Sequence, residues 1–594
     1  MFTVDFEPIG RRGECASDQS LLDCARQLSV DIVSICGGIG NCERCKVQVI
    51  AGRVSRPTLE EEASLTKNEL EQGYRLACQA YPLSDVRLHV PPESLTAPQR
   101  TQVEGLEVDV MPEPPVLGLD AQLSAPTLDA PIADDVNLWA SLGLPVGTID
   151  LHVQQMLSRT LRDLHWDVCV ALRTNEIISL GAPGTRWLGL AVDIGTTKIA
   201  GYLLDMESGK TLVAKGMMNP QISYGEDVIS RIAAASKSEE NARKLQALLT
   251  EALNQLAVDL CAEINANPTH IVDAVVVGNT AIHHLFLRLP VKQLGLAPYV
   301  PAIRSSLDIK AREIGLKIAP GAYVHLLSNI AGYVGADHVA MLLATRIAEA
   351  SQTTLAIDIG TNTEICLNHR GRMTSVSCAS GPAFEGAHIK FGMRAAPGAI
   401  EHVRLSNERL EIQTIGGDAP VGICGSGLLD VVAQLRLNNI LDRNGRMDPS
   451  GHSLVRDHDG MVEFVLVERE GQEAITISQK DVRELQLAKA AIRLGIQALV
   501  TAEEIAESDI EQVIIAGAFG TYIHVESAIT IGMLPALPLE RFTQVGNAAG
   551  TGARLALISE SQRERAKSIA QQDGYIELAA VSNFNRKFAE ATYL

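Results

Sequence analysis

One strand-and-turn motif occurs twice in this chain and limits the folds that the chain can adopt. The apolar run 190–192 leads into Asp193-Ile194-Gly195-Thr196, and the run 355–357 leads into Asp358-Ile359-Gly360-Thr361. Each copy has the pattern of a strand that enters a glycine turn and is followed by a second apolar strand. Two distant copies of one hairpin predict a duplicated α/β fold whose two halves face each other.

The two turns have the composition of a phosphate-binding site. Glycine lets the backbone approach phosphate oxygens, and threonine hydroxyls and turn amides donate hydrogen bonds to them. An aspartate at a strand end can hold Mg²⁺ or its water, so we expect Asp193 and Asp358 to do this. Lys198 either neutralises phosphate charge or caps a strand. The expected contacts to phosphate come from Gly195, Thr196, Thr197, Lys198, Gly360, Thr361 and Asn362.

A third glycine turn follows another apolar strand near the end of the chain. Val513-Ile514-Ile515-Ala516 runs into Gly517-Ala518-Phe519-Gly520. Such a turn can accommodate an adenosine, so Gly517 and Gly520 are the expected contacts. Two further glycine-rich segments, 425–427 and 546–550, either touch the nucleotide or are helix starts that pack tightly through small residues.

Four N-terminal cysteines are spaced like the ligands of a 2Fe-2S cluster. Five residues separate Cys36 from Cys42, two separate Cys42 from Cys45, and 32 separate Cys45 from Cys78. Three ligands on one loop and a distant fourth are typical of 2Fe-2S ferredoxins. The first spacing is one residue longer than in plant-type ferredoxins and matches the adrenodoxin-like variant. Glycines in 37–40 let backbone amides point at the cluster sulfurs.

Zinc is the main alternative for these cysteines, and unligated thiols are another. Structural zinc sites usually combine two short pairs of ligands, whereas here only Cys42 and Cys45 form such a pair. The favoured cofactor is therefore a 2Fe-2S cluster. The other seven of the 11 cysteines have no ligand-like spacing, so we expect buried small hydrophobic side chains there.

Composition excludes several classes of partner. The net charge of −20 over 594 residues argues against nucleic acid or an anionic membrane, because both would repel the protein. The first residues do not have the pattern of a secretion signal, and no apolar stretch approaches eighteen residues. We expect a cytoplasmic protein, with no nucleic-acid partner and no membrane.

The chain is expected to be a multidomain α/β protein. Residues 1–92 have the pattern of a β-grasp fold, and the proline-dotted stretch 93–115 that of a linker. Residues 116–186 predict a small α/β middle domain, with helices over 134–142 and 148–161. The duplicated region occupies 187–594.

The motifs together carry a resemblance to known families. The two turns and the third glycine segment resemble the actin, sugar kinase and Hsp70 superfamily, in which two ribonuclease-H-like lobes enclose ATP. With the ferredoxin-like segment added, nearly the full length resembles the ATP-dependent reductive activators of corrinoid proteins. The resemblance to this family extends to the segments 223–228, 278–280 and 380–386. Glu226 and Asp227 either orient water or metal or are surface carboxylates at a helix start.

The resemblance implies a function, cofactors and partners. A corrinoid methyl carrier that has lost an electron stalls as Co(II), and the activator returns it to Co(I) through a 2Fe-2S cluster with ATP and Mg²⁺. The implied partners are that carrier and an upstream low-potential electron donor; a homodimer is implied by the resemblance alone. Three alternatives stay open: a redox-sensing small-molecule kinase, a radical-dehydratase activator, and an electron-transfer protein whose nucleotide-binding domain is structural.

Overall fold

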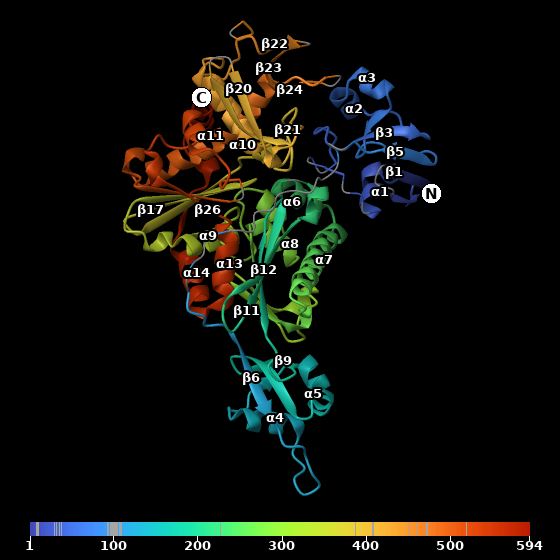
Figure 1. Cartoon of the computed structure of the whole chain (residues 1–594), viewed down its shortest axis with the longest axis vertical. Coiled ribbons are helices and arrows are strands. Elements are labelled where there is room, and N and C mark those ends of the chain that lie inside the picture. The colour runs from blue at the N-terminus through green and yellow to red at the C-terminus, as the bar shows by residue number, and fades with distance from the viewer. Residues whose placement is uncertain are drawn as a thin grey trace.

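The computed structural model forms three bodies along a long axis (Figure 1). The ferredoxin-like domain lies beside one end of the large two-lobed region, and the small middle domain lies at the opposite end. The structure describes residues 1–7, 11–28, 30, 32–34, 36, 38–91, 94, 105, 108, 110–225, 227–386, 388–406, 409–450, 452–458, 460–470, 473–517 and 519–594.

The N-terminal domain is a five-stranded β-grasp sheet, as predicted. Its strand order is β2-β1-β5-β3-β4, with β1 and β5 parallel and the other pairs antiparallel. Ser20 begins α1 by accepting a hydrogen bond from the Asp23 amide, and the apolar face of this helix covers the sheet. The elements are β1 Phe2–Glu7, β2 Arg11–Cys15, α1 Leu21–Gln27, β3 Lys46–Ala51, α2 Leu59–Ser64, α3 Lys67–Glu71, β4 Tyr74–Leu76 and β5 Val86–His89.

The middle domain has a four-stranded sheet in the order β6-β8-β9-β7. The prediction of a helix from residue 148 was wrong at its start, because Thr148–Ile149 pairs with β9 as a short strand. Asp150 then caps the helix by accepting from the His152 amide at 3.0 Å. The elements are β6 Val116–Gln122, α4 Asp134–Leu142, β7 Thr148–Ile149, α5 Leu151–Asp163, β8 Asp167–Arg173 and β9 Glu176–Gly181.

The first lobe is built on a six-stranded sheet in the order β12-β11-β10-β13-β15-β14. The first repeated motif forms the β10–β11 hairpin, and β13 and β15 continue the sheet in parallel. The elements are β10 Leu188–Ile194, β11 Lys198–Asp205, β12 Thr211–Met218, α6 Val228–Lys237, α7 Glu239–Glu263, β13 Ile271–Gly278, α8 Thr280–Phe286, β14 Leu307–Lys310, β15 Tyr323–Leu326 and α9 Ala336–Thr345.

The second lobe repeats five strands of this topology and places its sixth strand at the opposite edge. Its sheet order is β26-β25-β16-β17-β18-β27, and β16–β17–β18 are antiparallel while β16, β25 and β26 are parallel. The elements of this sheet and its helices are β16 Thr354–Ile359, β17 Thr363–His369, β18 Arg372–Cys378, α10 Gly425–Leu437, α11 Gln479–Ala502, β25 Gln512–Ala516, α12 Val525–Thr530, β26 Phe542–Gly546, β27 Gly574–Tyr575 and α15 Phe584–Ala591. After β26 the chain crosses to the first lobe, where α13 Ala548–Ile558 packs against β10, β13 and α9, and α14 Glu560–Gln572 packs against α9.

The matching strand patterns of the two lobes confirm the predicted duplication. The second lobe also carries two three-stranded sheets, on the side where the ferredoxin domain lies in Figure 1. They contain β19 Ala399–Ser406, β20 Arg409–Thr414, β21 Gly422–Ile423, β22 Val455–His458, β23 Met461–Val467 and β24 Ile475–Ser478.

The predicted linker, 93–115, is described only in part. Gly105 pairs with Gly546, and Glu113 pairs with Ser559, so the described part of this stretch runs along the end of β26 and α13. Pro92 and Glu93 lie outside the described residues. The domain boundaries drawn at residues 92, 115 and 186 stay predictions.

Candidate functional site

The four predicted cluster cysteines converge at one end of the ferredoxin domain. Cys36, Cys42 and Cys45 lie between α1 and β3, and Cys78 lies just after β4. The Gly40 amide donates to Cys36 Sγ at 3.3 Å. Gly40 has a φ of +95°, a conformation that few other residues adopt, and it turns this amide toward the sulfur. The prediction that glycines turn amides toward the cluster sulfurs also included Gly37, which lies outside the described residues.

The thiols of this loop are close enough to share protons. The pKa of Cys36 is lowered because the Cys42 and Cys78 thiols donate to it. The pKa of Cys78 is raised because its hydrogen bonds to Cys36 and Cys45 hold the proton, and burial raises it further. Converging thiols and an amide aimed at sulfur fit a four-thiolate iron-sulfur cluster.

The other seven cysteines are buried, as predicted. Burial raises the pKa of Cys169 and Cys261 to about 11, which keeps these thiols protonated at neutral pH. They behave as small apolar side chains.

The two repeated turns face each other across the lobes. Thr197 Oγ1 lies 3.3 Å from Thr361 Oγ1, although the two residues are far apart in the sequence. Asn279 also reaches the first turn, donating from Nδ2 to Thr196 Oγ1 at 3.2 Å. The hydroxyls predicted to bind phosphate are therefore brought together from both hairpins.

Four carboxyl groups gather behind the turns. Burial raises the pKa of Asp193 to about 6, and burial together with the charge of Asp193 raises that of Asp358 to about 7. Asp337, at the start of α9, has a pKa raised to about 8 by burial and by these two neighbours. The pKa of Glu364 is also raised, by burial and by the charges of Asp337 and Asp358. Partly buried like charges of this kind fit the binding of a divalent cation with phosphate.

Sequence reasoning missed several of these side chains. It singled out none of Asp337, Glu364, Glu385 and Asn547, although Glu385 and Asn547 lie in the segments 380–386 and 546–550 that it named. Asn547 Nδ2 donates to Asp193 Oδ2 at 3.0 Å and so lowers the pKa of that carboxyl against the effect of burial. Glu364 had a detectable signal, because it is the third residue after the repeated Asp-Ile-Gly-Thr turn. Asp337 had only its place at a helix start after a glycine.

The third glycine turn packs against the second hairpin. Gly517 has a φ of +91°, and a Cβ there would lie 2.6 Å from Asp358 Oδ1. Its amide donates to the Gly546 carbonyl at 3.0 Å. A Cβ at Gly520 would meet the Ala516 carbonyl oxygen at 2.3 Å. Close packing thus requires glycine at both positions. Their contact with adenosine stays a prediction. Ala518 lies outside the described residues.

The glycine segments 425–427 and 546–550 fit the alternative of helix starts that pack tightly through small residues. A Cβ on Gly425 would meet the Phe384 carbonyl at 1.9 Å, one on Gly427 the Ile400 carbonyl at 2.1 Å, and one on Gly550 the Tyr202 hydroxyl at 2.5 Å. Asp227 caps α6 by accepting from the Ser230 amide at 2.6 Å, as a carboxylate at a helix start does. Glu226 lies outside the described residues.

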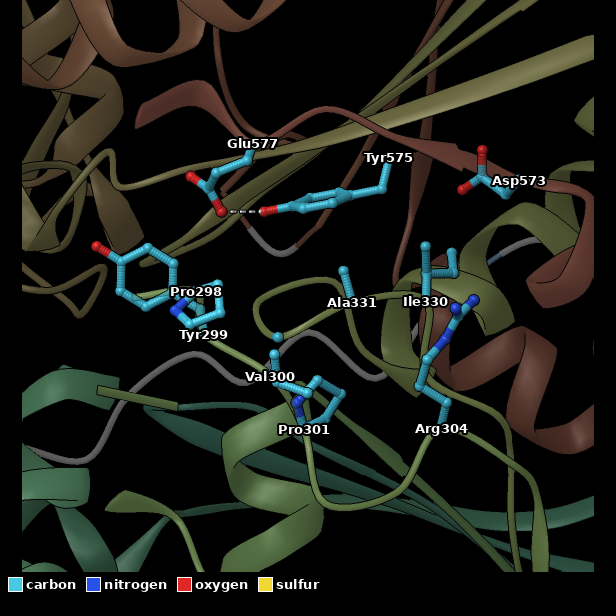
Figure 2. A pocket seen from close by; sticks show the side chains of 11 residues that line it. Pro298, Tyr299, Val300, Pro301, Arg304, Ile330, Ala331, Asp573, Tyr575 and Glu577 are labelled. Carbon is cyan, nitrogen blue, oxygen red and sulfur yellow. Dashed lines mark hydrogen bonds between the residues drawn. The ribbon is translucent and has the colours of Figure 1, made fainter. Parts of the chain in front are cut away.

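A separate cavity of about 310 Å³ lies between the loop 298–304 and the C-terminal segment 573–577 (Figure 2). Arg304 and Asp573 lie at one end, and Tyr575 and Glu577 follow Asp573 along the same wall, where Tyr575 donates to Glu577 at 2.8 Å. Within the described chain, its lining includes none of the residues predicted to bind the cluster or phosphate. This cavity is therefore distinct from the space between the two turns.

Within the described ranges, no helix combines the length and apolar character needed to cross a bilayer.

Comparisons with known protein families cover most of the chain. Residues 4–83 match the 2Fe-2S iron-sulfur cluster binding domain, which confirms the predicted ferredoxin domain. Residues 188–350 match the RACo middle region, and residues 352–594 match the C-terminal domain of RACo, the ASKHA domain. The border between these two models falls between the two lobes.

Individual relatives match over two thirds of this chain or more. The corrinoid activation enzyme RamQ of Eubacterium limosum is 32% identical over 96% of this chain and 95% of its own length. The [Co(II) methylated amine-specific corrinoid protein] reductase of Methanosarcina barkeri is 24% identical over 67% of this chain and 75% of its own length.

A solved structure extends this match to three dimensions. The reductive activator for corrinoid, iron-sulfur protein superposes with a TM-score of 0.73 and 34% identity, over 100% of this chain and 98% of that one. The cysteine loop, the facing hairpins and these full-length matches agree, and the chain belongs to the family of reductive activators of corrinoid proteins.

Proposed function

We propose that this protein reactivates a corrinoid protein by reducing its cobalt from Co(II) to Co(I), one electron at a time, in a reaction driven by ATP. The observation that carries the proposal is the presence, in one chain of this family, of a four-thiol loop and two facing phosphate turns. An upstream low-potential donor supplies the electron, and the corrinoid cobalt accepts it. The acceptor is a corrinoid methyl carrier.

We assign the cluster site to Cys36, Cys42, Cys45 and Cys78. The 2Fe-2S cluster, when bound, supplies one-electron redox chemistry at these thiolates. The chain itself keeps the site partly shielded: Cys42 is 8% and Cys78 is 7% exposed, while Cys36 is more open to solvent. An electron therefore enters or leaves most directly on the Cys36 side of the loop.

We assign phosphate binding to the two turns. Thr196, Thr197 and Thr361 hold hydroxyl donors near one point between the lobes, with Gly195, Gly360 and Asn362 beside them. Lys198 begins β11, and burial lowers its pKa while the charge of Glu385 opposes this effect. A phosphate beside Lys198 would favour its charged ammonium in the same way. Gly517 and Gly520 remain our candidates for the adenosine side.

We assign Mg²⁺ to Asp193 and Asp358, supported by Asp337. Their raised pKa values indicate negative charge that the described protein does not fully compensate, and a divalent cation would compensate it. Mutation of Asp193 and of Asp358 will show which carboxylate orients the attacking water.

ATP can supply enough free energy for an uphill electron transfer. A one-electron gap of about 120 mV is a factor of about 100 in the equilibrium constant. Moving a two-state protein from 1:99 to 99:1 takes about 5.5 kcal/mol of differential binding. Nucleotide binding can therefore offset such a gap if it favours the conformation that docks on the corrinoid protein.

The test mixes the cluster-loaded protein, a low-potential reductant and a Co(II) corrinoid methyl carrier without oxygen, and follows the absorption of Co(I). We expect Co(I) to form with Mg²⁺ and ATP and at least about tenfold more slowly without them. Equal rates with and without nucleotide would contradict the coupling, and no Co(I) in either case would contradict the function.

Two variants separate the alternatives. Cys42→Ser should abolish both the visible absorption of the cluster and Co(I) formation, whereas Cys261→Ser, which changes a buried thiol of α7, should affect neither. Phosphoryl transfer to an added small molecule would favour a kinase instead. A cytoplasmic location and a homodimer stay predictions.

A further inference from the structure

The ferredoxin domain touches both lobes through arginines. Arg44 lies between two cluster cysteines and donates from Nη2 to the carbonyl oxygens of Gly386 and Ile389, both at 3.0 Å. On the other lobe, the Arg26 guanidinium of α1 lies 4.7 Å from the centre of the Tyr224 ring. The domain therefore bridges the two lobes on one side of the nucleotide site.

The residue next to the Arg44 contact reaches the phosphate turns. Glu385 precedes Gly386, and its carboxylate accepts from Thr197 Oγ1 at 2.8 Å and from Thr361 Oγ1 at 2.5 Å. One hydroxyl comes from each repeated hairpin. A carboxylate thus occupies the position between the turns where the hydroxyls would otherwise donate to phosphate.

Glu385 and phosphate cannot both hold this position. Each threonine hydroxyl has one proton to donate, and a carboxylate beside a phosphate repels it. Binding of nucleotide phosphates between the turns therefore requires Glu385 to withdraw.

A displacement of the Glu385 backbone would shift the Arg44 contact. Gly386 is tightly packed: its φ is +80°, and a Cβ there would lie 2.5 Å from the Met393 amide nitrogen. A segment without free space transmits displacement instead of absorbing it. The carbonyl groups that accept from Arg44 lie on this segment.

The first lobe offers a parallel connection. Arg231 donates from Nη2 to the Thr196 carbonyl at 2.5 Å and from Nε to the Gly225 carbonyl at 2.8 Å. Gly225 follows Tyr224, the residue under Arg26. On the second lobe, Gly386 is thus one residue away from Glu385, which bonds to both phosphate turns. On the first lobe, Tyr224 is one residue away from Gly225, which is linked to the first turn through Arg231.

We infer that Glu385 and Arg44 couple nucleotide binding to the position of the ferredoxin domain. Without nucleotide, Glu385 holds the turns and Arg44 holds the domain against the second lobe. Nucleotide phosphates displace Glu385, the Arg44 contact weakens, and the domain is freed to bring its cluster to the corrinoid protein. The inference rests on the proposed function only in assuming that ATP binds between the two turns.

The coupling is reciprocal, so it predicts affinities as well as motion. Glu385→Gln removes the competing charge and should tighten binding of a non-hydrolysable ATP analogue at least about fivefold. Arg44→Ala breaks the other end of the connection and should also tighten it. Arg53→Ala, an exposed arginine elsewhere on the same domain, is the matched control and should leave affinity unchanged.

The movement itself is measured on the full, cluster-loaded chain. Nitroxide labels at Lys67→Cys in α3 and Ser582→Cys in the second lobe, both exposed positions, report the distance between the domain and the lobe by pulsed dipolar spectroscopy. We expect one narrow distribution without nucleotide and a broader, longer one with Mg²⁺ and the analogue. Arg44→Ala should give the broad distribution without nucleotide.

Two results would overturn the inference: an unchanged distance distribution when the analogue is bound, or weaker analogue binding by Glu385→Gln. These readouts need no corrinoid protein. A failure to form Co(I) would therefore contradict the proposed function and leave this inference standing, whereas distances that ignore bound nucleotide would contradict only the inference.

Discussion

The two copies of the Asp-Ile-Gly-Thr hairpin have the same backbone but different surroundings. In the first lobe, Asp193 accepts a hydrogen bond from Asn547. In the second lobe, Gly517 packs against Asp358, and burial together with the charge of Asp193 raises the pKa of Asp358 to about 7. Duplication thus preserved the shape of the phosphate turns, while the flanking segments made their electrostatics unequal. Asp358 has the more uncompensated charge and gains more from a bound cation.

The largest expected effect tests directly whether Asp193 and Asp358 contribute unequally to ATP hydrolysis. Asp358→Asn should reduce ATP hydrolysis about 10³-fold and Asp193→Asn about 10²-fold, the range found when one preorganised electrostatic group is removed. The smaller loss is expected at Asp193 because an asparagine there can still bond to Asn547. Steady-state ATP hydrolysis with Mg²⁺ measures both; equal losses would show that the two hairpins act alike.

Gly517 tests the packing of the second hairpin alone. Gly517→Ala should destabilise the protein by about 3 kcal/mol, because the new Cβ overlaps Asp358 and the backbone has a positive φ. Gly371→Ala is the matched control: its φ is +80° but nothing lies within 4 Å of the new Cβ, so about 1 kcal/mol is expected. Denaturant unfolding measures the difference, and equal losses would remove the role of close packing.

The carboxyl cluster predicts how stability depends on pH. The pKa values of Asp193, Asp358 and Asp337 are raised to about 6, 7 and 8, whereas an unfolded aspartate has a pKa of about 4. Between these values the unfolded state binds fewer protons than the native state, so stability falls as pH rises. We expect nucleotide-free protein to lose about 2 kcal/mol from pH 5 to 8, after allowing for solvent screening.

Asp337→Asn should flatten the upper part of this profile, between pH 7 and 8, and saturating Mg²⁺ with the ATP analogue should reverse the slope. Melting temperatures across the pH range measure both effects. Stability that rises steadily from pH 5 to 8 in the nucleotide-free protein would contradict the assignment.

The smallest effect concerns the amide that distinguishes the first hairpin. Asn547→Ala removes a hydrogen bond to a charged group, worth about 1.5 kcal/mol, and should weaken binding of Mg²⁺ and ATP roughly tenfold. The pKa of Asp193 should rise, so the acidic limb of the pH–rate profile should move to higher pH. An unmoved limb would mean that Asn547 does not set the charge of Asp193.

Part of this protein could be predicted from its local sequence. The cysteine spacing and the repeated hairpins depend on residues close together in the chain, where a turn or a strand fixes which groups meet. The fold class, the duplication and the ferredoxin domain were predicted correctly for this reason. The start of α5 was missed because Thr148 and Ile149 fit either a helix or a strand, and pairing with β9 decided between them.

The residues that were missed share one property: their roles depend on distant neighbours. Asp337 stands in ordinary local sequence at a helix start. Asn547 and Glu385 lie in the named segments 546–550 and 380–386, but nothing local distinguished these two side chains from their neighbours. Their importance comes from meeting Asp193 and the two threonines after the lobes have folded.

The amino-acid sequence thus specifies two binding chemistries, thiolates for iron and hydroxyl-lined turns for phosphate. Each can be recognised because most of its residues lie close together in one loop or hairpin. The folded chain alone establishes how the two are connected. Arg44 in the cluster loop and Glu385 between the turns lie more than 300 residues apart in the sequence, and one short segment of the second lobe links them. Burial and close packing, which no local pattern records, bring the two sites into contact.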